Sequence, residues 1–270
     1  MLKTKRYSLF SQLVLFFCAY FYAEISGAAP RQAIVGVATN FITTIETLQR
    51  DFETRHEGKL IVVGGSTGKL YAQINQGAPI DIFLSADQAR PAQLEDDGLA
   101  IVGSQFTYAI GRLIAWLPGR STGPGHFSLS QEETVALLKN SSRIALANAD
   151  LAPYGLASKQ LLQSLGLYEE LGSRIVRGEN IGQTFSLISS GNAEAGFIAF
   201  TQALAHPETV KNNRYWMVDE KLHTPIRQDA ILLKRAAKNP LALAFLQYLR
   251  SPAARQIMRE AGYATADYRP

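Results

Sequence analysis

The sequence predicts an α/β protein of two lobes, each with a mostly parallel sheet flanked by helices. Short apolar runs alternate with amphipathic helix patterns, and this alternation is typical of parallel βαβ units. It is interrupted once, by the longer strand-like stretch "SQFTYAIGRLIAWLPGR", and begins again at "RIALANAD". The 270 residues are 47% hydrophobic, which is enough for a sizeable core. No low-complexity linker separates the two series, so we expect the chain to cross between lobes near residues 105–110 and 220–227.

The first series starts with the strand pattern "AIVGVA", residues 33–38. A helix is expected next, because Ile45 and Phe52 share one helical face and Thr43 and Glu46 have the spacing of a capping box. The following patterns are the strand "KLIVVGGS", the short helix "GKLYAQINQG" and the strand "DIFLSA".

The second series consists of the strands "RIALANAD", "RIVRG" and "AGFIAF", with the helices "LASKQLLQSLG" and "QTFSLISSG" between them. Two helices that begin at Pro240 and Pro252 are expected near the end of the chain, because each proline follows a good N-cap residue. We therefore assign residues 29–108 and 224–270 to lobe 1 and residues 109–223 to lobe 2.

The first 28 residues are predicted to be a secretory signal peptide. Lys3, Lys5 and Arg6 form a basic start, an apolar run follows, and Ser26 and Ala28 give a small-x-small cleavage pattern. The alternative is a membrane anchor that stays attached. Either interpretation predicts that the remaining chain works outside the cytoplasm.

Several classes of function lack the residues they require. Cys18 is the only cysteine, so the mature chain has no thiol nucleophile, disulfide or cysteine metal site. The four histidines have no i, i+4 spacing, and no G-x-S-x-G motif is present, which argues against a metal centre and a serine hydrolase. The net charge is +4 without a basic run, so no nucleic-acid partner is expected.

The stretch "GGSTGKLYAQI" resembles half of a phosphate-binding loop. Val63 stands where that motif needs glycine, and Leu70 where it needs a hydroxyl for Mg²⁺, so a nucleotide site is not predicted. The hydroxyls of Ser66 and Thr67 remain, together with the free N–H groups of a helix's first turn. The alternative is an ordinary capped helix start.

Three more stretches place donors between a strand and a helix. "ATNF" contains Thr39 and Asn40, "APYG" contains Tyr154, and "ENIGQT" places Ile181 and Gly182 at the turn. Ligands of open α/β sheets bind beyond the carboxyl ends of the strands. If the lobes face each other, four helix N-termini converge on one cleft, and their uncharged donors would form a small-anion site.

Other charged residues near these stretches are expected to have structural roles. Asp81 is predicted to make hydrogen bonds at a strand start and Asp87 to cap the next helix. We expect Lys69 to face solvent.

These motifs resemble the periplasmic molybdate-binding proteins of ABC importers. "VATNF", "GGSTGKLYAQI", "GAPIDIFLSAD" and "FTYAIGRLIAW" occur in that family's order and spacing, followed by "APYGLA" and "GENIGQT". The resemblance covers essentially the whole mature chain and implies a two-lobed periplasmic-binding-protein fold with the ligand cleft between the lobes. It implies that molybdate or tungstate is bound by Thr39, Asn40, Ser66, Thr67, Tyr154 and the backbone N–H of Ile181.

The same resemblance implies a monomeric periplasmic receptor that delivers the oxyanion to an ABC permease in the inner membrane. It implies no enzymatic activity, no cofactor and no directly bound metal, since the metal arrives only as its oxyanion. A fully deprotonated tetrahedral oxyanion only accepts hydrogen bonds, so a site made of donors alone suits it. Two alternatives stay open, namely the same scaffold binding sulfate, phosphate or a small organic anion, and a secreted hydrolase.

Overall fold

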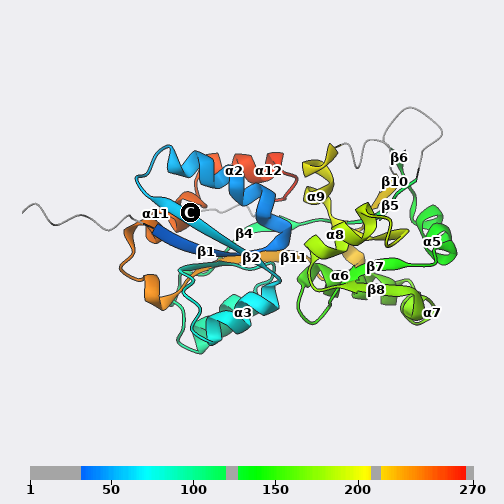
Figure 1. The fold of residues 1–270 in the computed structure, drawn as a ribbon, viewed down its shortest axis with the longest axis horizontal. Helices are drawn as coiled ribbons and strands as arrows, with labels where there is room; N and C mark the ends of the chain where they lie inside the picture. Colours follow the sequence, from blue (N-terminus) through cyan, green and yellow to red (C-terminus); the bar gives the residue numbers. More distant parts are fainter. Residues whose placement is uncertain (1–31, 120–126, 208–213, 266–270) are drawn as a thin grey trace, which may run out of the picture. The chain divides into compact units, whose positions relative to one another are not determined.

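Two mixed β-sheets organise the part of the chain that the computed structural model describes, residues 32–119, 127–207 and 214–265 (Figure 1). The predicted signal peptide lies outside these residues. The first sheet has the order β2-β1-β3-β11-β4 and the second the order β6-β10-β5-β9-β7-β8. Two sheets with helices on their faces confirm the predicted two-lobed α/β class.

In the first sheet, only the three strands of the first βα series pair in parallel. β1 pairs in parallel with β2 and β3, whereas β11 runs antiparallel to both β3 and β4. The strands are β1 (Gln32–Ala38), β2 (Lys59–Gly65), β3 (Ile82–Leu84), β4 (Phe106–Gly111) and β11 (Ile226–Leu232).

Helices cover both faces of this sheet (Figure 1). α2, α11 and α12 bury Ile45, Phe245 and Met258 against one face, and α3 and α4 bury Leu70 and Leu94 against the other. The helical elements are η1 (Thr39–Phe41), α2 (Ile42–Glu53), α3 (Thr67–Asn75), α4 (Ala89–Asp96), η4 (Lys234–Ala236), α11 (Pro240–Tyr248) and α12 (Pro252–Glu260).

The start of α2 differs from the prediction. The helix begins at Ile42 rather than after Thr43, and its N-cap Phe41 makes no side-chain cap. The 3-10 turn η1 leads directly into α2, so the helical segment starts at Thr39 and Thr43 already lies inside it. The predicted capping box at Thr43 and Glu46 is therefore wrong.

The second sheet carries its helices in the same way. α5, α6 and α7 pack on the face that contains Leu146 and Phe197, and α8 and α9 on the face that contains Trp116 and Ile198. The strands are β5 (Leu113–Leu117), β6 (Phe127–Ser128), β7 (Ile144–Ala147), β8 (Ile175–Gly178), β9 (Ala195–Ala199) and β10 (Arg214–Met217). The helical elements are α5 (Gln131–Asn140), α6 (Pro153–Ser164), α7 (Tyr168–Leu171), η2 (Gly172–Arg174), α8 (Ile181–Ser189), α9 (Phe200–Ala205) and η3 (Glu220–Leu222).

The chain passes between the sheets at two places. β4 belongs to the first sheet and β5 to the second, so Arg112 is the first crossing, and the predicted lobe boundary after residue 108 falls inside β4. The return lies between η3 and β11. The end of the described chain joins the same region, because Ile110 and Ala264 form an antiparallel bridge.

The predicted structural roles of Asp81 and Asp87 are confirmed. The Asp81 carboxylate accepts from the Ile34 N–H at 2.8 Å and pairs with Arg235 at 3.1 Å. The Asp87 carboxylate accepts from the Arg90 N–H in the first turn of α4. Among the described residues, no helix has the length and apolarity needed to cross a membrane.

Replacing Asp81 by alanine is expected to lower the free energy of unfolding by about 1–3 kcal/mol, because the Ile34 N–H loses its acceptor in a partly buried setting. Urea unfolding measures the change. The control is Asp96→Ala, at an exposed position of α4, which should have little effect. Equal stability of the Asp81 variant and the parent would contradict the assigned role.

Candidate functional site

In each sheet, two neighbouring parallel strands end at the same level, and a helix begins after each of these four strand ends. Ala38 at the end of β1 stands opposite Gly65 at the end of β2, and Ala147 at the end of β7 stands opposite Gly178 at the end of β8. η1, α3, α6 and α8 begin just after these strand ends. Each helix start carries N–H groups that lack an intrahelical partner, together with the positive end of the helix dipole.

A small cavity of about 10 Å³ lies where these helix starts meet. A space of this size holds about one water-sized sphere, which is far too small for a sugar or a nucleotide. All the residues predicted to bind the anion line this cavity, from both lobes. The lining residues are Ala38, Thr39, Asn40, Ser66, Thr67, Ala86, Ala152, Pro153, Tyr154, Asn180 and Ile181.

None of these lining residues carries a charged side chain. Within the described parts of the chain, no cluster of histidine, cysteine and acidic residues has a spacing that suits a metal ion. What the cavity offers is therefore hydroxyl and N–H groups backed by helix N-termini. Such an arrangement favours an anion that accepts hydrogen bonds.

Two of the hydroxyls are already oriented. Thr67 Oγ1 accepts from the Ala86 N–H at 3.0 Å, and Ser66 Oγ accepts from the Lys69 N–H at 3.4 Å as the N-cap of α3. A hydroxyl whose lone pair is engaged in this way still has its hydrogen to donate. The structure shows no hydrogen bond from the Thr39 hydroxyl to the described residues, so this group is also free to donate.

Lobe 2 contributes backbone N–H groups. Tyr154 follows Pro153 in the first turn of α6, and Ile181 is the first residue of α8, whose N-cap Asn180 accepts from the Gln183 N–H. Close packing fixes the start of α6, because a Cβ added to Gly155 would lie 2.4 Å from the Ala147 carbonyl oxygen. Only glycine allows this approach of helix and strand.

Asn40 lines the cavity, but its side-chain amide is used in hydrogen bonds to other residues. Its Nδ2 donates to Gln228 Oε1 at 2.8 Å and to the Tyr263 hydroxyl at 3.1 Å. Its carbonyl oxygen accepts from the hydroxyls of Tyr263 and Thr201, the second of which comes from lobe 2. The group that Asn40 has left to offer the cavity is therefore its backbone N–H.

The Tyr154 side chain is also held in place by its surroundings. The hydroxyl packs against Gly111, since a Cβ placed on that glycine would lie 2.1 Å from it. Gly111 ends β4, next to the first crossing. Burial raises the pKa of Tyr154 well above its ordinary value, so the phenol stays neutral in the physiological range.

Direct contacts join the two lobes beside the cavity. The Gly68 N–H donates to the Leu151 carbonyl at 2.9 Å, and Arg90 donates to the Asp150 carbonyl at 2.7 Å. Lys69 in α3 pairs with Glu179, which precedes α8, at 3.0 Å. The Lys69 side chain is about half exposed, as expected, but it also bridges the lobes.

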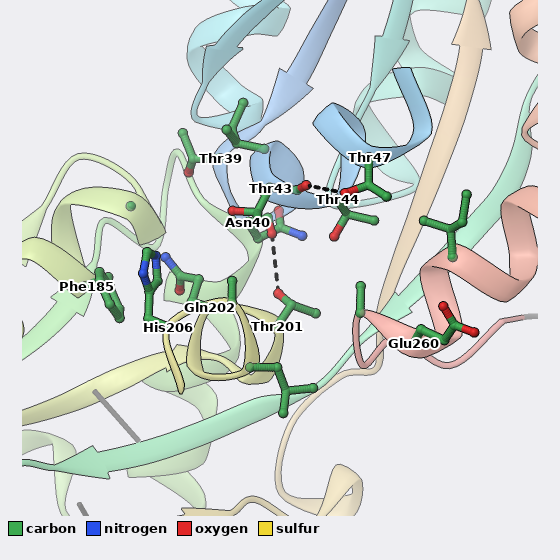
Figure 2. Close-up of a pocket in the computed structure, with 16 residues that line it drawn as sticks. Thr39, Asn40, Thr43, Thr44, Thr47, Phe185, Thr201, Gln202, His206 and Glu260 are labelled. Atoms are coloured by element: carbon green, nitrogen blue, oxygen red, sulfur yellow. Dashed lines mark hydrogen bonds between the residues drawn. The ribbon is translucent and has the colours of Figure 1, made fainter. Parts of the chain in front are cut away.

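A larger pocket of about 520 Å³ shares Thr39 and Asn40 with the small cavity. Figure 2 shows it between α2 and α12 on one side and α8 and α9 on the other, with the Thr201 hydroxyl bonded to Asn40. Thr43 and Thr47 of α2 line one side of the pocket, and Gln202 and His206 the other. This pocket is an opening between the lobes next to the small cavity.

Comparison with known proteins points to one family. Residues 33–264 match the sequence profile of the family described as bacterial extracellular solute-binding protein. The chain is 37% identical to the molybdate-binding protein ModA of Rhodobacter capsulatus over 239 residues, which cover 88% of this chain and 90% of that one. It is also 37% identical to ModA of Azotobacter vinelandii over 254 residues, which cover 94% and 97% of the two chains.

The fold agrees with this result. The periplasmic molybdate-binding protein of Azotobacter vinelandii superposes with a TM-score of 0.78 at 35% identity, covering 87% of this chain and all of that one. Residues 33–264, which match the family profile, include every residue that lines the cavity.

Proposed function

Because the chain belongs to the bacterial extracellular solute-binding protein family, we propose that it captures molybdate or tungstate and delivers it to the permease of an ABC importer. The observation that carries this proposal is the cavity itself. Helix starts from both lobes surround a compact space with uncharged donors, in a chain that is 37% identical to molybdate-binding proteins.

The donor set explains why such a site takes an oxyanion without lysine or arginine. Thr39, Ser66 and Thr67 supply hydroxyl hydrogens, and Tyr154 and Ile181 supply backbone N–H groups. Hydrogen bonds to a charged acceptor are about twice as strong as neutral ones, and the helix dipoles add to them. Monoprotonated phosphate is disfavoured, because its proton finds no acceptor among these groups.

The remaining features of the proposal follow from this role. The protein acts as a monomer in the periplasm after removal of residues 1–28, and its partner is a permease in the inner membrane. It needs no cofactor and catalyses no reaction, and it binds metal only as the oxyanion. Donors divided between two lobes bind the anion best when the lobes are closed, so ligand binding shifts the population towards the closed state.

Titration with oxyanions tests the proposal directly. Molybdate and tungstate are expected to raise the melting temperature of the mature protein, because a ligand that binds only the folded state adds about 4 kcal/mol of stability at a thousandfold excess over its dissociation constant. Differential scanning fluorimetry measures the shift. Sulfate and phosphate at equal concentration are the comparison. A clear shift with sulfate and none with molybdate or tungstate would reassign the ligand, and turnover of a chromogenic ester would indicate a hydrolase.

Thr39→Val is expected to weaken molybdate binding by about 1–3 kcal/mol, since it removes one hydroxyl donor to a charged ligand and keeps the branched shape. Thr39→Ser keeps the donor and should bind nearly as well as the parent. Thr43→Val, one turn along α2 and outside the small cavity, is the control. Isothermal titration calorimetry gives the dissociation constants, and unchanged affinity in Thr39→Val would mean that the donor set is misplaced.

The ion pair between Lys69 and Glu179 is expected to stabilise the closed state. Both side chains are partly exposed, so the coupling should be only about 0.2–1 kcal/mol. It should appear in a double-mutant cycle of Lys69→Gln and Glu179→Gln as faster dissociation of molybdate in stopped-flow measurements. The matched control is the pair of Lys139 and Glu170, which lies within lobe 2 at 3.1 Å. Equal effects of the two pairs would count against a role in closure.

A further inference from the structure

A buried glutamine on the return strand has an unused donor close to the anion cavity. Gln228 in β11 is 0% exposed, and its Oε1 accepts from Asn40 Nδ2 at 2.8 Å. The Tyr108 hydroxyl lies 3.3 Å from the same oxygen and 3.2 Å from the Ser85 carbonyl, so its one hydrogen is shared between the two. Gln228 Nε2 is buried and has no hydrogen-bond partner among the described residues. A buried donor of this kind has a cost unless a partner reaches it.

The surrounding hydrogen bonds fix which way this amide points. The Tyr263 hydroxyl is 2.8 Å from the Asn40 carbonyl, which can only accept, so the hydroxyl hydrogen is used there. Tyr263 must therefore accept from Asn40 Nδ2. Nδ2 in turn donates to Gln228, so the atom of Gln228 that faces Asn40 is its oxygen. Gln228 Nε2 therefore lies on the side of the amide that faces away from Asn40.

The partner that completes the network comes from lobe 2. The Tyr154 hydroxyl is buried and, like Gln228 Nε2, lacks a hydrogen bond of good geometry among the described residues. The side chains of Gln228 and Asn40 nevertheless lie close enough to offset part of the rise in the pKa of Tyr154 that burial causes. Both atoms lie against the same glycine, since a Cβ added to Gly111 would be 2.1 Å from the Tyr154 oxygen and 3.0 Å from Gln228 Nε2. The donor Gln228 Nε2 and the acceptor oxygen of Tyr154 thus lie beside the same glycine, near the first crossing between the lobes.

We propose that Gln228 is a positioning residue for the anion site, which donates from Nε2 to the Tyr154 hydroxyl when the anion is bound while its Oε1 holds Asn40. This inference rests on the proposed function. Gln228 would connect the start of α6 in lobe 2 with η1 in lobe 1 through a single side chain. The backbone N–H groups of Tyr154 and Asn40 would then reach their positions around the anion together.

Tyr154→Phe and Gln228→Met test this role, singly and combined, in the mature protein. Tyr154→Phe is expected to raise the dissociation constant for molybdate by about three- to tenfold, the effect of one lost neutral hydrogen bond. The change should appear in the dissociation rate, with the association rate unaltered. Gln228→Met should weaken binding further, because Asn40 also loses its acceptor, and adding Tyr154→Phe to it should have no additional effect.

Tyr248→Phe is the matched control, because Tyr248 is a buried tyrosine of lobe 1 whose hydroxyl donates to Asp51 at 2.7 Å, away from the cavity. It should change the melting temperature of the free protein and leave molybdate binding intact. Independent, additive effects of Tyr154→Phe and Gln228→Met, or parent-like binding by Tyr154→Phe, would overturn the positioning role. Absence of molybdate binding by the parent protein would instead overturn the proposed function.

Discussion

The convergence of helix N-termini on one small cavity is the feature on which the rest of the structure depends. Parallel pairing places the carboxyl ends of β1 and β2 at one edge, and of β7 and β8 at another. Each following helix must then begin at that edge. A site built this way needs no charged side chain, because its positive potential comes from backbone dipoles that the fold has already ordered.

This arrangement has consequences for the polar residues around it. Thr67 and Ser66 accept backbone N–H groups, so each is held with its hydrogen left to donate. Asn40 is held even more firmly, between Gln228 and Tyr263, which leaves its backbone N–H as the group it can offer to the cavity. A ligand therefore meets donors that lose little further freedom on binding, which reduces the entropic cost of association.

The sequence was sufficient to predict the main strands and helices of the two βα series and the residues around the cavity, because both depend on local patterns. The helix α5 (Gln131–Asn140) and the short strand β6 (Phe127–Ser128) were not predicted. A strand followed by a donor and a helix start is visible within ten residues, as at Thr39 or Thr67. The partners of Asn40 were not predictable, since Gln228 and Tyr263 lie 188 and 223 residues away in the chain. The capping box at Thr43 failed for a similar reason, because a 3-10 turn tied to lobe 2 through Thr201 starts the helix earlier.

The contacts between the lobes also indicate what drives closure in the proposed receptor. The pair of Lys69 and Glu179 is largely exposed, and exposed ion pairs contribute at most about 1 kcal/mol. The hydrogen bond from Gly68 to Leu151 is neutral and of similar size. Moving a population from mostly open to mostly closed requires about 5.5 kcal/mol of differential binding. In the proposed receptor an anion with several charge-assisted bonds divided between the lobes would supply most of that amount, and the contacts between the lobes would adjust the lifetime of the closed state.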